Sequence, residues 1–280
     1  MKRKLQVLLL SLISCFIIIL LFGLYTPKFG FKNQLAVIMY HHVHDKDVSG
    51  NTITSKLFRD QLSYLVNKGY HFVTLNEAKA YLQGDKIKDK AVLVTFDDGY
   101  ESFYKNAYPI LKSLHIPAVN FIITSTLSNP KINIPKLSPE EIKFMINDSP
   151  LVEVQCHTDS LHVKSSISKS LLVTRLTDKG KKETDAQYFS RVSNDTKVCI
   201  KKLEPLNRGV IDTFAYPYGI LSKEAIEALS SSGIKYAFTI NPRMTTRKTN
   251  PMRIPRINAG GPGITPEKLE ASIKRYVLKP

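Results

Sequence analysis

The 280-residue sequence has no internal repeat and no low-complexity tract, which excludes repeat architectures. None of its seven histidines lies beyond position 162, so no imidazole can come from the C-terminal part of the chain. Of its three cysteines, only Cys156 and Cys199 follow the first segment, and the sequence does not decide whether they pair. Cys156 directly precedes His157. On a strand these two side chains point to opposite faces, so we expect Cys156 to lie in the core and not to be a ligand beside His157.

A long apolar stretch occupies residues 5–24, directly after three basic residues at positions 2–4. About 20 apolar residues are enough to span a bilayer, and the preceding positive charges favour a cytoplasmic start and export of the rest. No Ala-x-Ala cleavage site is evident. We therefore expect an uncleaved anchor and short linker in residues 1–30 and one domain, residues 31–280, on the extracellular face of the membrane. A cleaved signal peptide and a lipid anchor at Cys15 are the alternatives.

The formal net charge is +16, and +13 remains outside positions 2–4. A basic exported protein is expected to associate with anionic cell-surface polymers or lipid headgroups. Export and the absence of a recognised nucleic-acid-binding motif argue against a nucleic-acid partner.

Apolar runs typical of strands alternate with helical patterns along the domain. The expected strands are residues 36–40, 91–96, 118–123, 151–154, 211–215 and 236–240. Helices are expected from Leu57 to a stop near Gly69, and over residues 222–229 with a stop at Gly233. The lysine-rich region 164–208 predicts helix and surface loop. This alternation indicates β/α units, and a length of about 250 residues is that of a single barrel.

The most informative motif is TFDDG at positions 95–99, which follows the apolar run 91–94. Neighbours on a strand point to opposite faces, so Asp97 and Asp98 can serve one site only where the strand ends in a loop, which Gly99 permits. One carboxylate could then hold a metal while the other handles a proton. A simple Asp-Asp-Gly turn is the alternative at this point.

Two imidazoles lie five residues apart in HTDSLH at positions 157–162. On a continuing helix or strand these rings would not share a ligand, so the chain must turn between them. Asp98, His157 and His162 would then form a two-histidine, one-carboxylate set with open positions, as in catalytic zinc sites. Iron, cobalt or nickel would suit the same set.

With FAYPYG at 214–219 as a third motif, the chain resembles the NodB-type polysaccharide deacetylases over roughly residues 35–260. The resemblance implies a distorted (β/α) barrel with fewer than eight regular strands. Within the family, the chain looks most like the extracellular biofilm enzymes that act on poly-β-1,6-N-acetylglucosamine. Three features carry this likeness: MYHHV at 39–43, YKNAYPIL at 104–111 and the six-residue histidine motif.

The resemblance also implies roles for single residues. It makes Asp98, His157 and His162 the ligands of one divalent ion, first of all Zn²⁺, Asp97 the general base, and the backbone N–H of Tyr218 an oxyanion donor. Tyr216 could line a sugar groove or pack inside the barrel.

Two departures from the general family pattern affect the expected site. Many relatives use a late catalytic histidine, which this chain lacks, so the resemblance to the biofilm group points to His41 as general acid, in preference to His42 and His44. A solvated loop histidine is the alternative. Many relatives also have an arginine where this chain has Ala215. Arg256 could approach Asp97 in its place and contribute to substrate binding, or be a surface or structural residue.

The expected reaction is hydrolysis of N-acetyl groups on an extracellular N-acetylglucosamine polymer, with acetate released. Peptidoglycan or chitin-type glycan is the alternative substrate. A catalytically weak glycan-binding surface protein is the alternative of another class, and the complete set of Asp97, Asp98, His157 and His162 counts against it.

Overall fold

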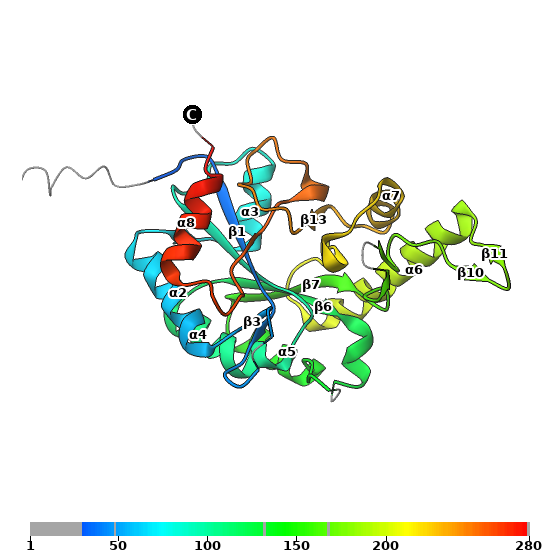
Figure 1. Ribbon diagram of the computed structural model, residues 1–280, viewed down its shortest axis with the longest axis horizontal. Helices are drawn as coiled ribbons and strands as arrows, with labels where there is room; N and C mark the ends of the chain where they lie inside the picture. The colour runs from blue at the N-terminus through cyan, green and yellow to red at the C-terminus, as the bar shows by residue number, and fades with distance from the viewer. Residues whose placement is uncertain (1–29, 48, 131–132, 167–168, 279–280) are drawn as a thin grey trace, which may run out of the picture. The chain divides into compact units, whose positions relative to one another are not determined.

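A parallel sheet forms the centre of the computed structural model, which describes residues 30–47, 49–130, 133–166 and 169–278. Seven strands follow one another in the order β13-β12-β7-β6-β5-β1-β14, and β4 pairs with the start of β5 (Figure 1). Their bounds are β1 Leu35–Tyr40, β4 His71–Phe72, β5 Ala91–Phe96, β6 Ala118–Ile123, β7 Val152–Thr158, β12 Thr213–Ala215, β13 Tyr236–Phe238 and β14 Ile257–Asn258. Only β1, β5, β6 and β7 are longer than three residues, so the described sheet has eight strands of which four are long and regular.

The segment 254–259 contacts both edges of the sheet. Ile254 pairs in parallel with Phe238 of β13 and donates its backbone N–H to Ala237 at 2.8 Å. A few residues on, Ile257 pairs with Ile38 of β1, and Ala259 donates to the Met39 carbonyl at 2.9 Å. The sheet therefore curls round into a distorted barrel.

The sheet is buried on both faces, as parallel sheets with helical crossovers are. All six residues of β1, β5 and β6 are buried. Alternate residues of these strands, such as Val37, Leu93 and Phe121, form one apolar cluster with Phe238 and Ile254. Because both ends of the sheet contribute to it, this cluster fills the barrel and fixes the relative positions of the strand ends.

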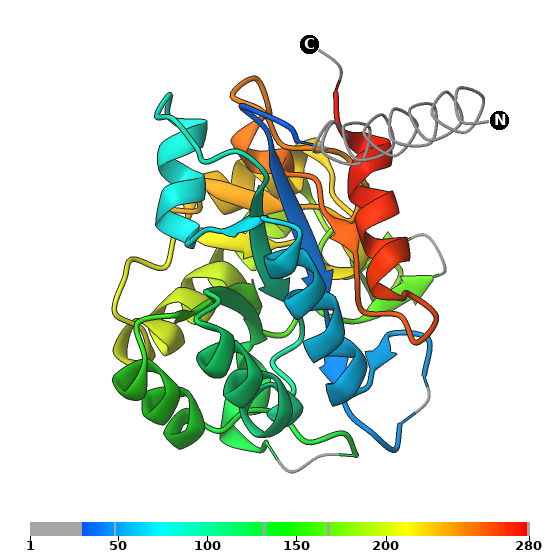
Figure 2. The ribbon, with the colours of Figure 1, turned by 90° about the vertical axis from the view of Figure 1, so that its left-hand side faces the viewer.

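Helices cover the outside of the barrel (Figures 1 and 2). Their bounds are α2 Ser55–Asn67, α3 Leu75–Leu82, α4 Tyr108–Leu114, α5 Pro139–Asp148, α6 Asp185–Leu203, α7 Lys223–Ser231 and α8 Pro266–Tyr276. Short helical turns cover Phe103–Ala107, Thr124–Ser128, Glu204–Leu206, Pro217–Gly219 and Pro251–Arg253. Side-chain caps begin several of the helices: Thr184 accepts from Gln187 at α6 and Ser222 from Ala225 at α7. Helices α2 and α8 lie side by side in both views, and the Tyr64 hydroxyl donates to Glu270 at 3.2 Å.

The lysine-rich region contains more regular structure than helix and loop. Before α6 it forms two antiparallel hairpins, β8 Lys164–Ser166 with β9 Lys169–Ser170, and β10 Thr177–Asp178 with β11 Lys181–Lys182. A further small pair is β2 His42–Val43 with β3 Thr52–Ile53. The β10–β11 hairpin lies beside the start of α6, away from the sheet (Figure 1).

The expected membrane segment, residues 5–24, lies outside the described residues. Among the residues that are described, no helix has the length and apolar character needed to cross a membrane. Lys32–Pro280 form one compact unit.

Candidate active site

The predicted site residues meet at the carboxyl ends of the sheet strands, where barrel enzymes collect their functional groups. His41 follows β1, Asp97 and Asp98 follow β5, His157 ends β7 with His162 shortly after it, and Tyr216 and Tyr218 follow β12. Residues from four separate strands are thus brought together, although 177 positions separate the first and last of them in the chain.

Asp98, His157 and His162 form a compact cluster whose ligand atoms all lie within 4.8 Å of one another. Asp98 Oδ1 is 3.3 Å from His157 Nε2 and 3.2 Å from His162 Nε2. Ligands at about 2.1 Å from a tetrahedral zinc ion are about 3.4 Å apart, so these separations fit such an ion.

The chemistry of the cluster also fits a cation. Asp98 Oδ1 is buried and accepts no hydrogen bond from the described residues. His157 Nδ1 lies 2.7 Å from the Ala215 carbonyl, which can only accept, so Nδ1 carries the proton and Nε2 directs a lone pair at Asp98. Burial and the neighbouring His157 lower the pKa of His162 to about 4, which keeps that ring neutral and able to bind a metal. A divalent ion would satisfy these converging lone pairs.

The turn that lets both carboxylates reach one site begins one residue earlier than the sequence suggests. Asp98 itself has a φ of 73°, and Gly99 follows with a φ of 64°. A positive φ is uncommon outside glycine, although aspartate adopts it more readily than most residues. The change of backbone direction at Asp98 breaks the strand alternation, so Asp97 and Asp98 both line the same cavity.

Asp97 is held by a buried arginine. Arg256 Nη1 donates to Asp97 Oδ1 and Nη2 to Oδ2, both at 2.7 Å, while Nε donates to the Thr239 carbonyl at 2.9 Å. Burial alone would raise the pKa of the Asp97 carboxyl, but the Arg256 guanidinium, followed by the facing His157, holds it below its usual range. Arg256 therefore contacts Asp97 in place of the arginine that is missing at Ala215. Its side chain is 0% exposed, which leaves it no surface for contacting a substrate.

Of the three histidines that follow β1, namely His41, His42 and His44, only His41 lines the cavity. Its Nε2 lies 3.9 Å from Asp97 Oδ2. His42 is instead paired through Nδ1 with the Ser102 hydroxyl at 2.7 Å, and His44 Nδ1 accepts the backbone N–H of Asp47 at 3.0 Å. The position of His41 is the one expected for an acid–base group beside Asp97.

The two tyrosines after β12 differ in exposure. Tyr218 has a φ of 59°, and its ring lies 4.5 Å from that of His162. Tyr216 is fully buried and donates its hydroxyl to the Met252 carbonyl at 2.9 Å, although it borders the cavity. This bond holds the Tyr216 side chain in the wall of the barrel.

The cavity has a volume of about 400 Å³, large enough for a sugar unit. Besides the predicted residues it is lined by Met39, Asn51, Lys164, Ile240 and Asn258, which the sequence did not single out. Asn258 reaches the cavity through its pairing with Met39 of β1, two residues before His41. Met39 belongs to the motif MYHHV at 39–43, whereas no local signal marks Asn51, Lys164 or Ile240.

Cys156 and Cys199 form a disulfide between β7 and α6, with 6.0 Å between their Cα atoms. The expectation that Cys156 lies in the core is confirmed, because it is fully buried and His157 on the next position faces the cavity.

Comparison with known proteins gives consistent results. A family model described as polysaccharide deacetylase matches residues 84–237. The chain is 30% identical over 245 residues to the poly-β-1,6-N-acetyl-D-glucosamine N-deacetylase of Staphylococcus aureus strain MSSA476, covering 87% of this chain and 78% of that protein.

Two solved structures share the architecture. IcaB from Ammonifex degensii superposes with a TM-score of 0.72 at 30% identity, covering 86% of this chain and 97% of that one. A de-N-acetylase from Aggregatibacter actinomycetemcomitans has a TM-score of 0.75 at 24% identity and covers 86% of this chain and 100% of that one, which supports the fold alone.

Proposed function

Because this chain belongs to the polysaccharide deacetylase family, we propose that it removes N-acetyl groups from an extracellular poly-β-1,6-N-acetylglucosamine by a metal-dependent hydrolysis that releases acetate. The observation that carries the proposal is one cavity that holds both a potential metal cluster and a carboxylate fixed by a buried arginine. The substrate is taken from the name of the relative that is 30% identical over most of this chain.

Asp98, His157 and His162 would hold the ion. A divalent cation bound there supplies two effects: it lowers the pKa of a water molecule, and it polarises the acetyl carbonyl. Zn²⁺ suits this donor set best, and Co²⁺, Ni²⁺ or Fe²⁺ would also fit it.

Asp97 would act as general base. Its pKa is held below the usual range, so the carboxylate is ionised at neutral pH and can accept the proton of the attacking water. Arg256 occupies one lone pair on each oxygen, which leaves others directed toward the cavity. The bidentate pair also fixes the plane of the carboxylate, so the base does not have to reorient during the reaction.

His41 would act as general acid. An amine is a poor leaving group until it is protonated, and the His41 ring lines the cavity within 3.9 Å of Asp97. We expect loss of this proton donor to slow turnover by about 10²- to 10⁴-fold.

The backbone N–H of Tyr218 would stabilise the developing oxyanion. The left-handed conformation at Tyr218 and Gly219 changes the chain direction beside His162, where such a donor is needed. A single oxyanion donor typically contributes about 10²- to 10³-fold to the rate.

The site of action would be the outer face of the membrane, with residues 1–30 as an uncleaved anchor. Residues 5–24 are apolar enough for this role, and the basic residues before them favour export of the remainder. The net charge of +13 that remains outside positions 2–4 would add attraction to anionic polymers of the cell surface.

Acetate release tests the function directly. Metal-loaded protein is incubated with oligomers of β-1,6-linked N-acetylglucosamine, with β-1,4-linked chitin oligomers and with peptidoglycan fragments. We expect acetate from the β-1,6 oligomers. Release from the β-1,4 substrates alone would support the proposed deacetylation but show that the substrate is a β-1,4-linked glycan. No release from any of them, with metal bound, would favour a glycan-binding protein.

A further inference from the structure

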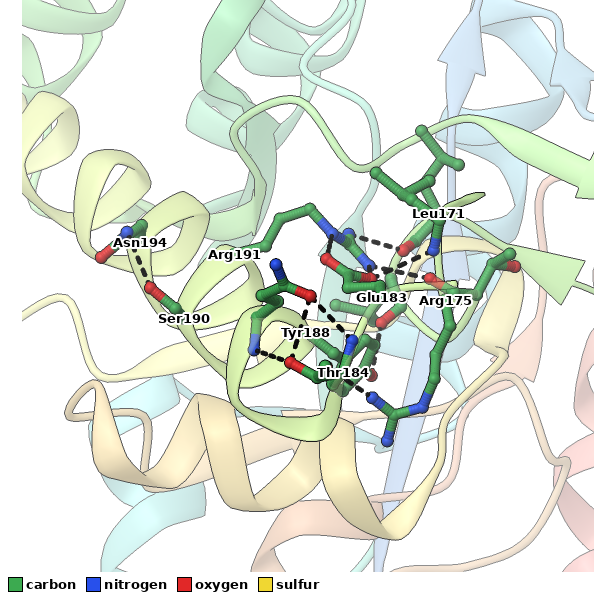
Figure 3. A network of polar contacts seen from close by, with 12 residues as sticks. Leu171, Arg175, Glu183, Thr184, Tyr188, Ser190, Arg191 and Asn194 are labelled. Atoms are coloured by element: carbon green, nitrogen blue, oxygen red, sulfur yellow. Dashed lines mark hydrogen bonds and ion pairs between the residues drawn. The ribbon is translucent and has the colours of Figure 1, made fainter. Parts of the chain in front are cut away.

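One face of α6 is directed at the segment that carries the two histidines. Asp195, Cys199 and Lys202 are four and three residues apart, so their side chains lie on the same side of the helix. Each of the three contacts the chain between residues 156 and 160, whereas the first half of α6 holds a different part of the protein. There Arg191 pairs with Glu183 (Figure 3). The Tyr188 hydroxyl donates to the Leu172 carbonyl at 2.7 Å.

The Asp195 carboxylate accepts three hydrogen bonds from the turn that separates the histidines. Thr158 donates its hydroxyl to Oδ1 at 2.6 Å, and the backbone N–H of Asp159 donates to the same oxygen at 2.9 Å. The backbone N–H of Ser160 donates to Oδ2 at 2.7 Å. Thr158 is the last residue of β7, and the two backbone N–H groups of Asp159 and Ser160 lie beyond the strand, so they need an acceptor outside the sheet.

The same turn is closed by its own residues and by Lys202. Leu161 donates its N–H to the Thr158 hydroxyl oxygen at 3.1 Å, which brings the chain back toward the cavity just before His162. Lys202 Nζ lies 2.7 Å from Asp159 Oδ1, which also accepts the Thr124 hydroxyl at 2.6 Å. The turn is therefore attached to α6 on one side and to the end of β6 on the other.

We propose that Asp195 is a positioning residue that sets the affinity of the metal cluster by fixing the turn between His157 and His162. The inference rests on the proposed function, since it concerns the same three ligands. Asp195 contacts none of them. Asp195 affects the cluster through the position of His162. His157 is fixed by β7, whereas His162 returns to Asp98 only if residues 158–160 keep their conformation. With the turn fixed in advance, less conformational entropy is lost when the ion binds.

The substitution Asp195→Asn tests this role with almost no change in shape. A carboxylate can accept all three hydrogen bonds, but one terminal atom of asparagine is an NH₂ donor. At least one N–H or O–H of the turn then faces a donor and loses its partner. We expect the affinity of the full chain for Co²⁺, followed by its visible absorption, to fall about tenfold. The melting temperature of the metal-free protein should stay near the wild-type value, and acetate release should recover at saturating metal.

Asp185→Asn is the matched control, because Asp185 lies on the same helix, is 97% exposed and pairs only with Arg175 among the contacts described. It should leave Co²⁺ affinity unchanged. If Asp195→Asn lowers the metal-free melting temperature strongly, Lys202→Gln replaces it as the test. This exposed substitution removes the ion pair to Asp159 and should weaken Co²⁺ binding in the same direction.

Unchanged Co²⁺ affinity in the folded Asp195→Asn protein, or in Lys202→Gln where that variant replaces it, would overturn the inference. The outcome is separable from that of the proposed function. A wild-type protein that binds Co²⁺ but releases no acetate would contradict the proposed function, while weaker Co²⁺ binding by Asp195→Asn would still support the positioning role. A wild-type protein that binds no Co²⁺ would contradict both.

Discussion

At the scale of single residues, Asp97 and Asp98 are chemically identical neighbours with different partners. Both oxygens of Asp97 receive hydrogen bonds from Arg256. Asp98 Oδ1 receives none from the described residues and faces the Nε2 atoms of His157 and His162. Environment alone thus distinguishes a carboxylate that can move a proton from one that can hold an ion.

Arg256→Met should separate catalysis from metal binding. Removing the guanidinium leaves the Asp97 carboxylate buried without its partner, which we expect to lower the free energy of unfolding by about 3–5 kcal/mol. Turnover should fall at least about 10²-fold because the pKa of the base rises and its orientation is lost, while the metal content stays unchanged. Urea unfolding, kcat and metal analysis measure the three effects.

Arg253→Met is the control for Arg256→Met, since Arg253 lies three residues earlier in the chain but is exposed. It should behave as wild type. A fully active Arg256→Met protein would contradict the role given to the Asp97 pair.

The residues that sequence could identify are those at strand ends. Asp97, Asp98 and His157 directly follow or end apolar runs, and the motif spacing places His162 with them. The sequence does not decide the role of Arg256, because its approach to Asp97 depends on how segment 254–259 crosses from β13 to β1. Asp195 had no signal of its own, since an acidic residue in the middle of a polar helix is usually solvated.

At the scale of elements, the turn after β12 depends on Gly219. Its φ is 69°, and a Cβ added there would lie 2.3 Å from Ile240 Cγ1. Ile240 borders the cavity, so any substituent at position 219 must displace either the cavity wall or the Tyr218 backbone.

Gly219→Ala should therefore reduce kcat by about 10- to 10²-fold, because the proposed oxyanion donor at Tyr218 would be displaced. Gly84→Ala is a matched control. Gly84 also has a positive φ, 118°, but a Cβ there meets nothing within 4 Å. Both variants should lose some stability, and only Gly219→Ala should lose rate. Equal kcat values in the two variants would show that the Tyr218 turn does not contribute to catalysis.

The disulfide joins α6 to β7 across a sequence separation of 43 residues. Closing a loop of that length is expected to stabilise the fold by about 2–4 kcal/mol. Complete reduction should therefore shift the urea midpoint downward. The double variant Cys156→Ala, Cys199→Ala should show the same low midpoint with and without reductant. A wild-type midpoint that does not respond to complete reduction would show that the cross-link does not stabilise the protein.

Element prediction succeeded where apolar runs are long and failed where tertiary contacts decide. The expected strands 91–96 and 118–123 match β5 and β6 in both bounds. The strands β8, β10 and β11 are exposed and polar, so no alternation of apolar residues predicts them. β14 has two residues, and only its pairing with β1 makes it a strand.

At the scale of the whole molecule, the protein and the deacetylated product both carry positive charge. The net charge is +16, and Lys164 lines the cavity. Each deacetylation converts a neutral N-acetyl group into an amine that is protonated near neutral pH. The substrate therefore becomes more cationic as the reaction proceeds and should be repelled increasingly by the protein.

KM should consequently rise with the fraction of glucosamine in the substrate. Raising the ionic strength from about 0.05 to about 0.3 M should reduce this rise, because the screening length becomes shorter than the span of the charged surface. Fully acetylated oligomers are the control, since their KM should respond little to salt. A KM that falls as the substrate is deacetylated would mean that the carboxylates of the cavity, and not the net charge, govern binding.

Metal content and acetate release, determined together in Asp97→Asn and Asp98→Asn, test the division of labour between the two carboxylates most directly. Asp97→Asn should bind a divalent ion as the wild type does and release acetate at least about 10²-fold more slowly. Asp98→Asn should lose the ion and the activity together. Full activity in Asp97→Asn, or an ion retained with unchanged affinity in Asp98→Asn, would contradict the account.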